Sequence, residues 1–91
     1  MDRTRYLELI EPALATVVKK HQDYNTNQQL ADYFPFGDKS YVQMLHVKSK
    51  RLVSLASSDT PPNFESARDT VLDLINYAVF YLDHLDNKDK I

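Results

Sequence analysis

Apolar residues recur every three or four positions in three stretches of the chain, and polar segments separate these stretches. The stretches cover about residues 4–23, 40–56 and 64–85. This spacing puts apolar side chains on one side of a helix, and it predicts three amphipathic helices. Pro12 lies inside the first stretch. Because proline lacks the N–H of the helical hydrogen bond, it predicts either a kink in one helix or the start of a second.

The segments between the helices differ in character. Residues 24–39 contain several large apolar side chains, which are Leu30, Tyr33, Phe34 and Phe36. They are too apolar for a linker exposed to water, and they predict an ordered loop that folds back onto the helices. Residues 57–63 are polar and carry two prolines, which indicates a break. The charged residues 86–91 predict a frayed tail.

These elements predict an all-α fold, a bundle of three or four helices in one domain that spans residues 1–91. A chain of this length buries only about 60–65% of its unfolded surface, so its own core is modest. The last predicted helix is apolar over more than half of its circumference. We therefore expect a homodimer to complete the bundle, with Tyr77, Phe80 or Tyr81 buried between the subunits.

Composition excludes several classes of protein. The chain has no cysteine, which excludes a disulfide framework and a thiolate zinc site. Gly37 is the only glycine, and this excludes a glycine-rich phosphate-binding loop. The sequence has no apolar run of the ~20 residues that a membrane span needs, and charged residues interrupt its beginning. With a net charge of −2, direct DNA binding is not expected, and the expected location is the cytoplasm.

An acidic stripe runs along the last predicted helix. Glu65, Asp69 and Asp73 are four residues apart, and Asn76 follows three residues later. Residues at this spacing share one side of a helix, although like charges there destabilise it slightly. Carboxylates are ligands that Mg²⁺ takes together with substrate phosphates, which makes the three acids candidate metal ligands and Asn76 a candidate substrate ligand. The alternative is an acidic face that water solvates.

Basic residues of the second predicted helix lie opposite this stripe. Lys48 falls near the centre of the apolar face, where an ammonium must reach water or meet an acid. We expect its partner to be Asp69 or Asp73. Lys48 and Arg51 are also suited to bind phosphate, with Asp23 completing the site from the first loop. The alternative is a purely structural pair of opposite charges.

Two blocks of the sequence resemble a known family. The first block carries Lys48, Arg51, Leu52 and Leu55. The second block carries Glu65, Ser66, Asp69, Thr70, Asp73, Leu74, Asn76, Tyr77 and Ala78. Together they resemble the nucleotide modification-associated domain 1 family, which is common in bacteriophages and mobile elements. The segment 21–24 is similar to a shorter upstream element of that family.

The resemblance implies a helical fold similar to the MazG-type nucleotide pyrophosphohydrolases, with acidic metal ligands on facing helices. It leads to the hypothesis that the chain binds a nucleotide or its phosphates through Mg²⁺, with hydrolysis of a pyrophosphate bond left open. Asn25 and Val47 depart from the family pattern, which often has glycine and an acid there. Glu8 and Glu11 are a poor substitute for the paired glutamates of the MazG-type enzymes.

These departures favour an alternative function. In that alternative the chain is a non-catalytic phage or mobile-element protein that sequesters a nucleotide signal or binds a host protein. The sequence does not decide whether the protein is an enzyme. It leaves the base, the sugar and the bond broken unidentified.

Overall fold

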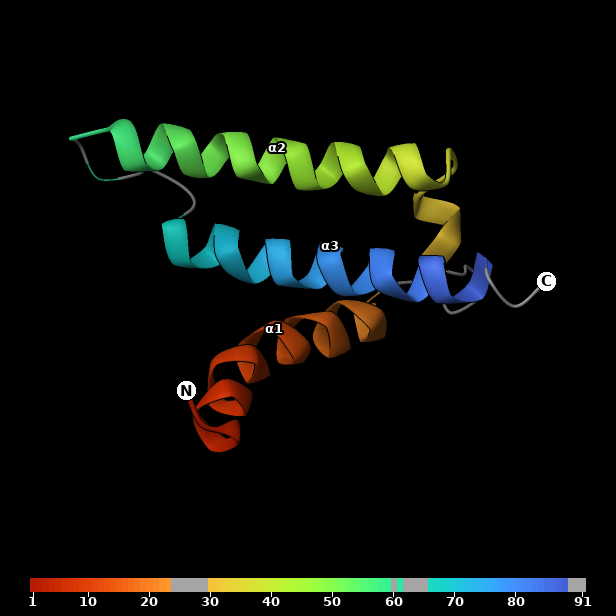
Figure 1. The fold of residues 1–91 in the computed structure, drawn as a ribbon, viewed down its shortest axis with the longest axis horizontal. Helices are drawn as coiled ribbons and strands as arrows, with labels where there is room; N and C mark the ends of the chain where they lie inside the picture. Colours follow the sequence, from red (N-terminus) through yellow and green to blue (C-terminus); the bar gives the residue numbers. More distant parts are fainter. Residues whose placement is uncertain (24–29, 60, 62–65, 89–91) are drawn as a thin grey trace.

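The structure is a computed structural model that describes residues 1–23, 30–59, 61 and 66–88, with residues 20–23 described by their backbone alone. Its elements are three α-helices and one short 3₁₀ helix, in the order α1 (Arg3–Asp23), η1 (Leu30–Tyr33), α2 (Asp38–Ser57) and α3 (Ala67–Lys88). No strand occurs in these residues, which confirms the predicted all-α class. In Figure 1, α2 and α3 run antiparallel, and α1 lies against α3 on the side away from α2.

Helix α1 continues through Pro12 as one helix. Figure 1 shows its first turns at an angle to the turns that follow, as expected for a helix with an internal proline. The Thr16 hydroxyl donates a hydrogen bond of 3.0 Å to the Pro12 carbonyl one turn earlier. Ala13 is only 1% exposed, so this small residue marks the place where α1 packs closely against its neighbour.

The segment before α2 folds back onto the helices. Phe34 is 8% exposed, and its ring stacks on that of Tyr41 of α2, with 4.2 Å between the ring centroids. The ring of Tyr81 from α3 also stacks on the Tyr41 ring, with 5.5 Å between the ring centroids. For residues 30–37 this confirms the predicted ordered loop, and residues 24–29 of that prediction lie outside the described residues.

The loop ends in a turn that requires glycine. Gly37 has a φ of 61°, a conformation that residues with a Cβ rarely adopt. The amides of Ser40 and Tyr41 both donate to the Gly37 carbonyl, which begins α2. The Ser40 hydroxyl accepts a hydrogen bond of 2.9 Å from the Phe36 amide, so it fixes the turn that precedes the helix.

The helix bounds differ in part from the predicted ones. Helix α2 begins at Asp38 rather than at residue 40, and α3 begins at Ala67 rather than at residue 64. Helix α3 also extends to Lys88, so the predicted fraying is wrong for residues 86–88. Lys88 forms an ion pair with α2, which gives the last turn a partner that local sequence does not reveal.

The three aromatic residues that were expected in a dimer interface pack within the chain instead. Phe34 contacts the rings of Tyr77 and Phe80 at centroid distances of 6.2 and 6.3 Å, and Tyr81 stacks on Tyr41. The loop that folds back supplies Phe34, which covers the side of α3 that the sequence left open. A second copy of the chain must therefore use a different surface if it binds.

The core is thin for a chain of this length. Among the described residues, the buried apolar side chains are Ala13, Phe34 and Tyr41. The accessible surface is 7426 Å², whereas a compact monomer of 10.6 kDa has roughly 5,500 Å². The radius of gyration is 15.0 Å, against about 12 Å for a compact domain of this length. Much apolar surface therefore stays in contact with water in the single chain.

Candidate functional site

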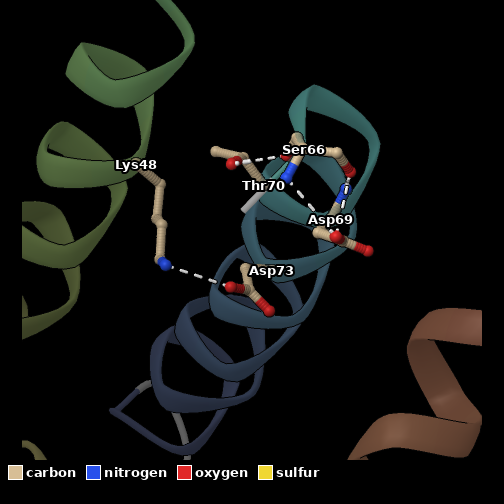
Figure 2. Close-up of polar contacts among 5 residues, drawn as sticks. All are labelled: Lys48, Ser66, Asp69, Thr70 and Asp73. Carbon is tan, nitrogen blue, oxygen red and sulfur yellow. Dashed lines mark hydrogen bonds and ion pairs between the residues drawn. The ribbon is translucent and has the colours of Figure 1, made fainter. Parts of the chain in front are cut away.

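Lys48 of α2 and Asp73 of α3 form an ion pair between the two helices. The Lys48 Nζ lies 3.0 Å from the Asp73 Oδ2, and the two side chains are 18% and 29% exposed. Figure 2 shows the lysine stem reaching across from α2 to the carboxylate. The sequence prediction that Lys48 meets an acid of the last helix is confirmed. The pair is partly desolvated, so its loss would cost more than the loss of a pair on the open surface.

Asp69 is part of a capping box at the start of α3. The Ser66 hydroxyl donates a hydrogen bond of 2.9 Å to the Asp69 Oδ2, and the Asp69 amide donates one of 3.1 Å to the Ser66 Oγ. The Ser66 amide also points to the Asp69 carboxylate, at 3.4 Å. These reciprocal bonds satisfy backbone N–H groups that have no partner inside the helix. Figure 2 shows the Asp69 carboxylate beside Ser66, at a different place on α3 from the Lys48–Asp73 pair.

Thr70 is a buried polar residue that the sequence did not single out. It is 0% exposed, and its hydroxyl donates a hydrogen bond of 3.0 Å to the Ser66 carbonyl. In Figure 2 it lies on the side of α3 that faces α2. The internal hydrogen bond satisfies its hydroxyl, which lets a polar residue take a place in the interface between the helices.

Asn76 joins α3 to α1. Its Nδ2 donates a hydrogen bond of 3.1 Å to the Ala13 carbonyl, across 63 positions of sequence. An amide beside an apolar core is costly unless it is hydrogen-bonded, and this bond satisfies that requirement. The geometry gives Asn76 a role in helix packing, while its role as a substrate ligand stays a prediction.

The structure brings only part of the predicted site together. Arg51 lies on α2 three residues after Lys48 and is half-buried. Asp23 is the last residue of α1, and its side chain lies outside the described residues, as does all of Glu65. Figure 1 shows α1 ending beside the second half of α3, whereas Asp69 and Asp73 belong to its first turns. Asp23 is therefore remote from both acids along α3.

The metal ligands do not converge in the part of the chain that the structure describes. Within residues 1–19, 30–59, 61 and 66–88, no group of three or more histidine or acidic side chains could hold a metal ion. The carboxylate of Asp73 pairs with a lysine, and that of Asp69 caps a helix. These two donors alone do not fit a magnesium site. The third, Glu65, is outside the described residues, so the proposed Mg²⁺ site stays a prediction.

A second cluster of charges joins the other ends of α2 and α3. The Lys88 Nζ lies 2.7 Å from the Asp38 Oδ2, and the His84 Nε2 lies 3.3 Å from the Asp38 Oδ1. The hydrogen bond from Lys88 lowers the pKa of Asp38 below its ordinary value of 3.8, and the nearby charges of Lys88 and His84 act in the same direction. Sequence reasoning missed this cluster because Asp38 and Lys88 are 50 positions apart.

A shallow hollow lies on the outer side of α1. Thr4, Leu7, Glu8 and Glu11 line it, and Glu8 forms an ion pair of 3.2 Å with Arg5. Two carboxylates at one hollow repel a phosphate group. The hollow is therefore a poor candidate for a nucleotide site.

The chain shows no match to any model of a protein family, to any curated protein or to any solved structure with which it was compared. In the described part of the chain, no helix is both long and apolar enough to cross a membrane.

Proposed function

We propose that the chain is a non-catalytic helical module that works by binding another protein through its apolar surface. The single observation that carries this proposal is the amount of apolar surface that the chain leaves open. Fifteen large hydrophobic residues of the described segments are at least 36% exposed, whereas three hydrophobic side chains are buried. Three of these residues, Val71, Leu82 and Leu85, recur at helical spacing on one side of α3, and exposed apolar residues that gather on one side of a small chain mark a binding surface.

The contacts of the candidate site support the same proposal. The three described polar residues of the acidic stripe have structural partners, because Asp69 bonds Ser66, Asp73 pairs with Lys48 and Asn76 bonds Ala13. A group that already holds two helices together must give up that contact before it can bind a ligand. This cost favours the non-catalytic alternative over the nucleotide-phosphate hypothesis.

Nucleotide-phosphate binding is the second candidate function. It is favoured by one observation, which is that Lys48 and Arg51 are both half-buried on α2, three residues apart, with Lys48 facing Asp73 of α3. In this candidate the chain belongs to the phage and mobile-element family that its two sequence blocks resemble. Glu65, Asp69 and Asp73 would then hold Mg²⁺, and the ion would compete with Lys48 for the Asp73 carboxylate.

A thermal-shift measurement separates the two functions. A ligand that binds only the folded state raises the melting temperature, by an amount that grows with its concentration over Kd. We expect no shift with nucleoside mono-, di- and triphosphates, each with Mg²⁺ and with a chelator, and no release of phosphate or pyrophosphate. A shift of several degrees that needs both a nucleotide and Mg²⁺ would overturn the non-catalytic proposal. Lys48→Met is the matched control for such a shift, because it removes the cation that would bind phosphate and keeps an apolar stem. A shift that comes from phosphate binding at Lys48 should be weaker in this variant.

A further inference from the structure

Helix α3 carries two apolar seams, and only one of them is covered. Tyr77, Tyr81 and His84 face α2 and its loop, where their rings contact Phe34 and Tyr41. The residues that follow these in sequence are Ala78, Leu82 and Leu85. Each is rotated by about 100° around the helix axis, which turns it away from α2. Leu82 is 59% exposed and Leu85 is 36% exposed.

The open seam has the spacing of a helix–helix interface. It begins at Val71 and continues through Ile75, Ala78, Leu82 and Leu85, with steps of four, three, four and three residues. This alternation keeps side chains in register with a partner helix over several turns. Asn76, which contacts α1, lies about 200° around the helix from Ala78, so α1 does not cover this seam either.

Helix α2 extends the same surface. Tyr41 and Lys48 face α3, and the residue after each of them, Val42 and Ser49, is turned to the side. Because α2 and α3 are antiparallel, the next residue on either helix points to the same side of the pair. We call this surface the outer hairpin face. Its exposed apolar residues are Val42, Val53, Val71, Ala78, Leu82 and Leu85.

We propose that the outer hairpin face binds the same face of a second copy of this chain, with the two α3 helices antiparallel and Ala78 at the two-fold axis. This proposal deepens the proposed function, on which it rests, by naming the partner. The two ends of the seam are symmetric about Ala78, because Val71 and Leu85 each lie seven residues from it, while Ile75 and Leu82 lie three and four residues from it. The small alanine side chain allows close approach of the two helices at their crossing point.

The charges beside the seam fit the antiparallel arrangement. Arg68 and Asp86 are 18 residues apart, which is five full turns, so both lie on one flank of α3. Arg68 is ten residues before Ala78 and Asp86 is eight residues after it, which corresponds to heights of about 15 and 12 Å. An antiparallel copy therefore brings the partner's Asp86 within reach of Arg68. In a parallel pair, Arg68 and the partner's Asp86 would lie about 27 Å apart along the helix axis.

The two charges oppose the dipole of their own helix. Arg68 is in the first turn of α3 and Asp86 is near its last, and both are exposed. A cation near the N-terminus and an anion near the C-terminus each destabilise a helix. Pairing with a second copy offsets this cost, and it explains why such charges lie beside the seam.

The excess exposed surface of the chain is similar to the area that a subunit buries in a homodimer. The chain exposes about 1,900 Å² more than a compact monomer of its mass. Each subunit of a permanent homodimer buries roughly 1,000–2,500 Å². A single contact between copies is thus large enough to bring the exposed area to an ordinary value.

Sedimentation velocity of the full chain tests the proposal. We expect a dimer at about 50 µM for the wild type and a monomer for Leu82→Glu, because the substitution places charges at the centre of the interface. Val47→Glu is the matched control, since Val47 is 47% exposed on the opposite side of α2, and it should stay dimeric. Circular dichroism checks that each variant keeps its helices, and Leu82→Ala gives the same direction of change without an added charge.

A charge exchange tests the antiparallel arrangement. Arg68→Glu should weaken the dimer at least tenfold, and the double variant Arg68→Glu with Asp86→Arg should restore it. Both changes agree with the helix dipole, so a loss of association cannot come from a destabilised helix. A monomeric wild type, a dimeric Leu82→Glu variant or a double variant that stays weak would overturn the proposal.

The two proposals fail in different experiments. If the wild type is a monomer and nucleotides do not shift its melting temperature, the proposed dimer is wrong but the proposed function stands. The partner of the outer hairpin face is then a different protein. Turnover of a nucleotide overturns the non-catalytic function whatever the oligomeric state is.

Discussion

The Lys48 ammonium lies 3.0 Å from the Asp73 carboxylate, and this contact ties the centre of α2 to the first half of α3. We expect Asp73→Asn to lower the free energy of unfolding by about 1–3 kcal/mol, between the values for exposed and for buried pairs. The reason is that the variant leaves the ammonium partly buried without its counter-charge. Chemical denaturation in urea measures the change.

A double-mutant cycle with Lys48→Met is the control for this first prediction. The methionine keeps the stem and removes the charge, so the double variant should recover much of the stability that Asp73→Asn loses. Melting temperatures with Mg²⁺, Mn²⁺ and a chelator test the other role of this residue. A metal response that the wild type shows and Asp73→Asn lacks would contradict a purely structural pair.

The capping box gives a second prediction. Ser66→Ala removes the hydroxyl that bonds Asp69, and it should cost about 1 kcal/mol of stability. Asp69→Ala should cost a similar amount. The double variant should lose less stability than the two single variants lose together, because Ser66 and Asp69 act through the same hydrogen bonds. If Asp69→Ala leaves the melting temperature unchanged in chelator but removes protection by Mg²⁺, the residue is a metal ligand instead.

The hydrogen bond between Asn76 and Ala13 leads to a third prediction. Asn76→Ala should lower stability by about 0.5–1.5 kcal/mol, because it removes a partly buried bond between α1 and α3. Asn76→Asp should cost more, because a carboxylate then faces the lone pairs of the Ala13 carbonyl. Urea denaturation at neutral pH compares the variants. Equal stability of Asn76→Ala and wild type would remove the packing role.

Acid should weaken the contact between the ends of α2 and α3. The hydrogen bond from Lys88 lowers the pKa of Asp38 in the folded state, so the folded protein favours the charged carboxylate more than the unfolded chain does. The stabilising contribution is therefore complete above the ordinary pKa of 3.8 and is lost as the pH falls through the folded-state value.

Two variants measure this pH dependence. The difference in melting temperature between wild type and Asp38→Asn should shrink as the pH falls from about 5 to about 2. Lys88→Met removes the main cause of the shift, so the same difference measured in its background should be smaller and should vary less with pH. A difference in melting temperature between wild type and Asp38→Asn that grows as the pH falls would contradict a stabilising role for the charged Asp38.

The sequence was sufficient to predict a contact that a residue's own position on its helix requires. Lys48 lies inside an apolar face, and an ammonium there needs an acid, which the stripe of α3 supplies. The cap was not predicted, although Ser66 precedes Asp69 by three residues, because a carboxylate in the first turn of a helix suits a cap and a metal site equally well. Only the geometry separates those roles.

Contacts that depend on how two helices align could not be predicted. The pairing of Asp38 with Lys88 requires the length of both helices and the turn between them. The loop was expected to fold back, yet the place of Phe34 against Tyr41 and Tyr77 depends on that alignment too. For this reason the sequence assigned the aromatic side of α3 to a second chain. It also took the stripe that contains Val71, Leu82 and Leu85 for the core side of the helix, which is wrong because these three side chains are exposed.

The unequal attachment of the helices has a consequence for hydrogen exchange. Helix α1 contacts α3 far less extensively than α2 does. We expect α1 to open as a separate unit, so that its amides exchange with solvent at a lower free-energy cost than those of α2 and α3. The α2–α3 hairpin stays folded in that opened state and exposes the flank that Ala13 had covered. Detachment of α1 would thus give the hairpin a second, transient binding side without disturbing the outer hairpin face.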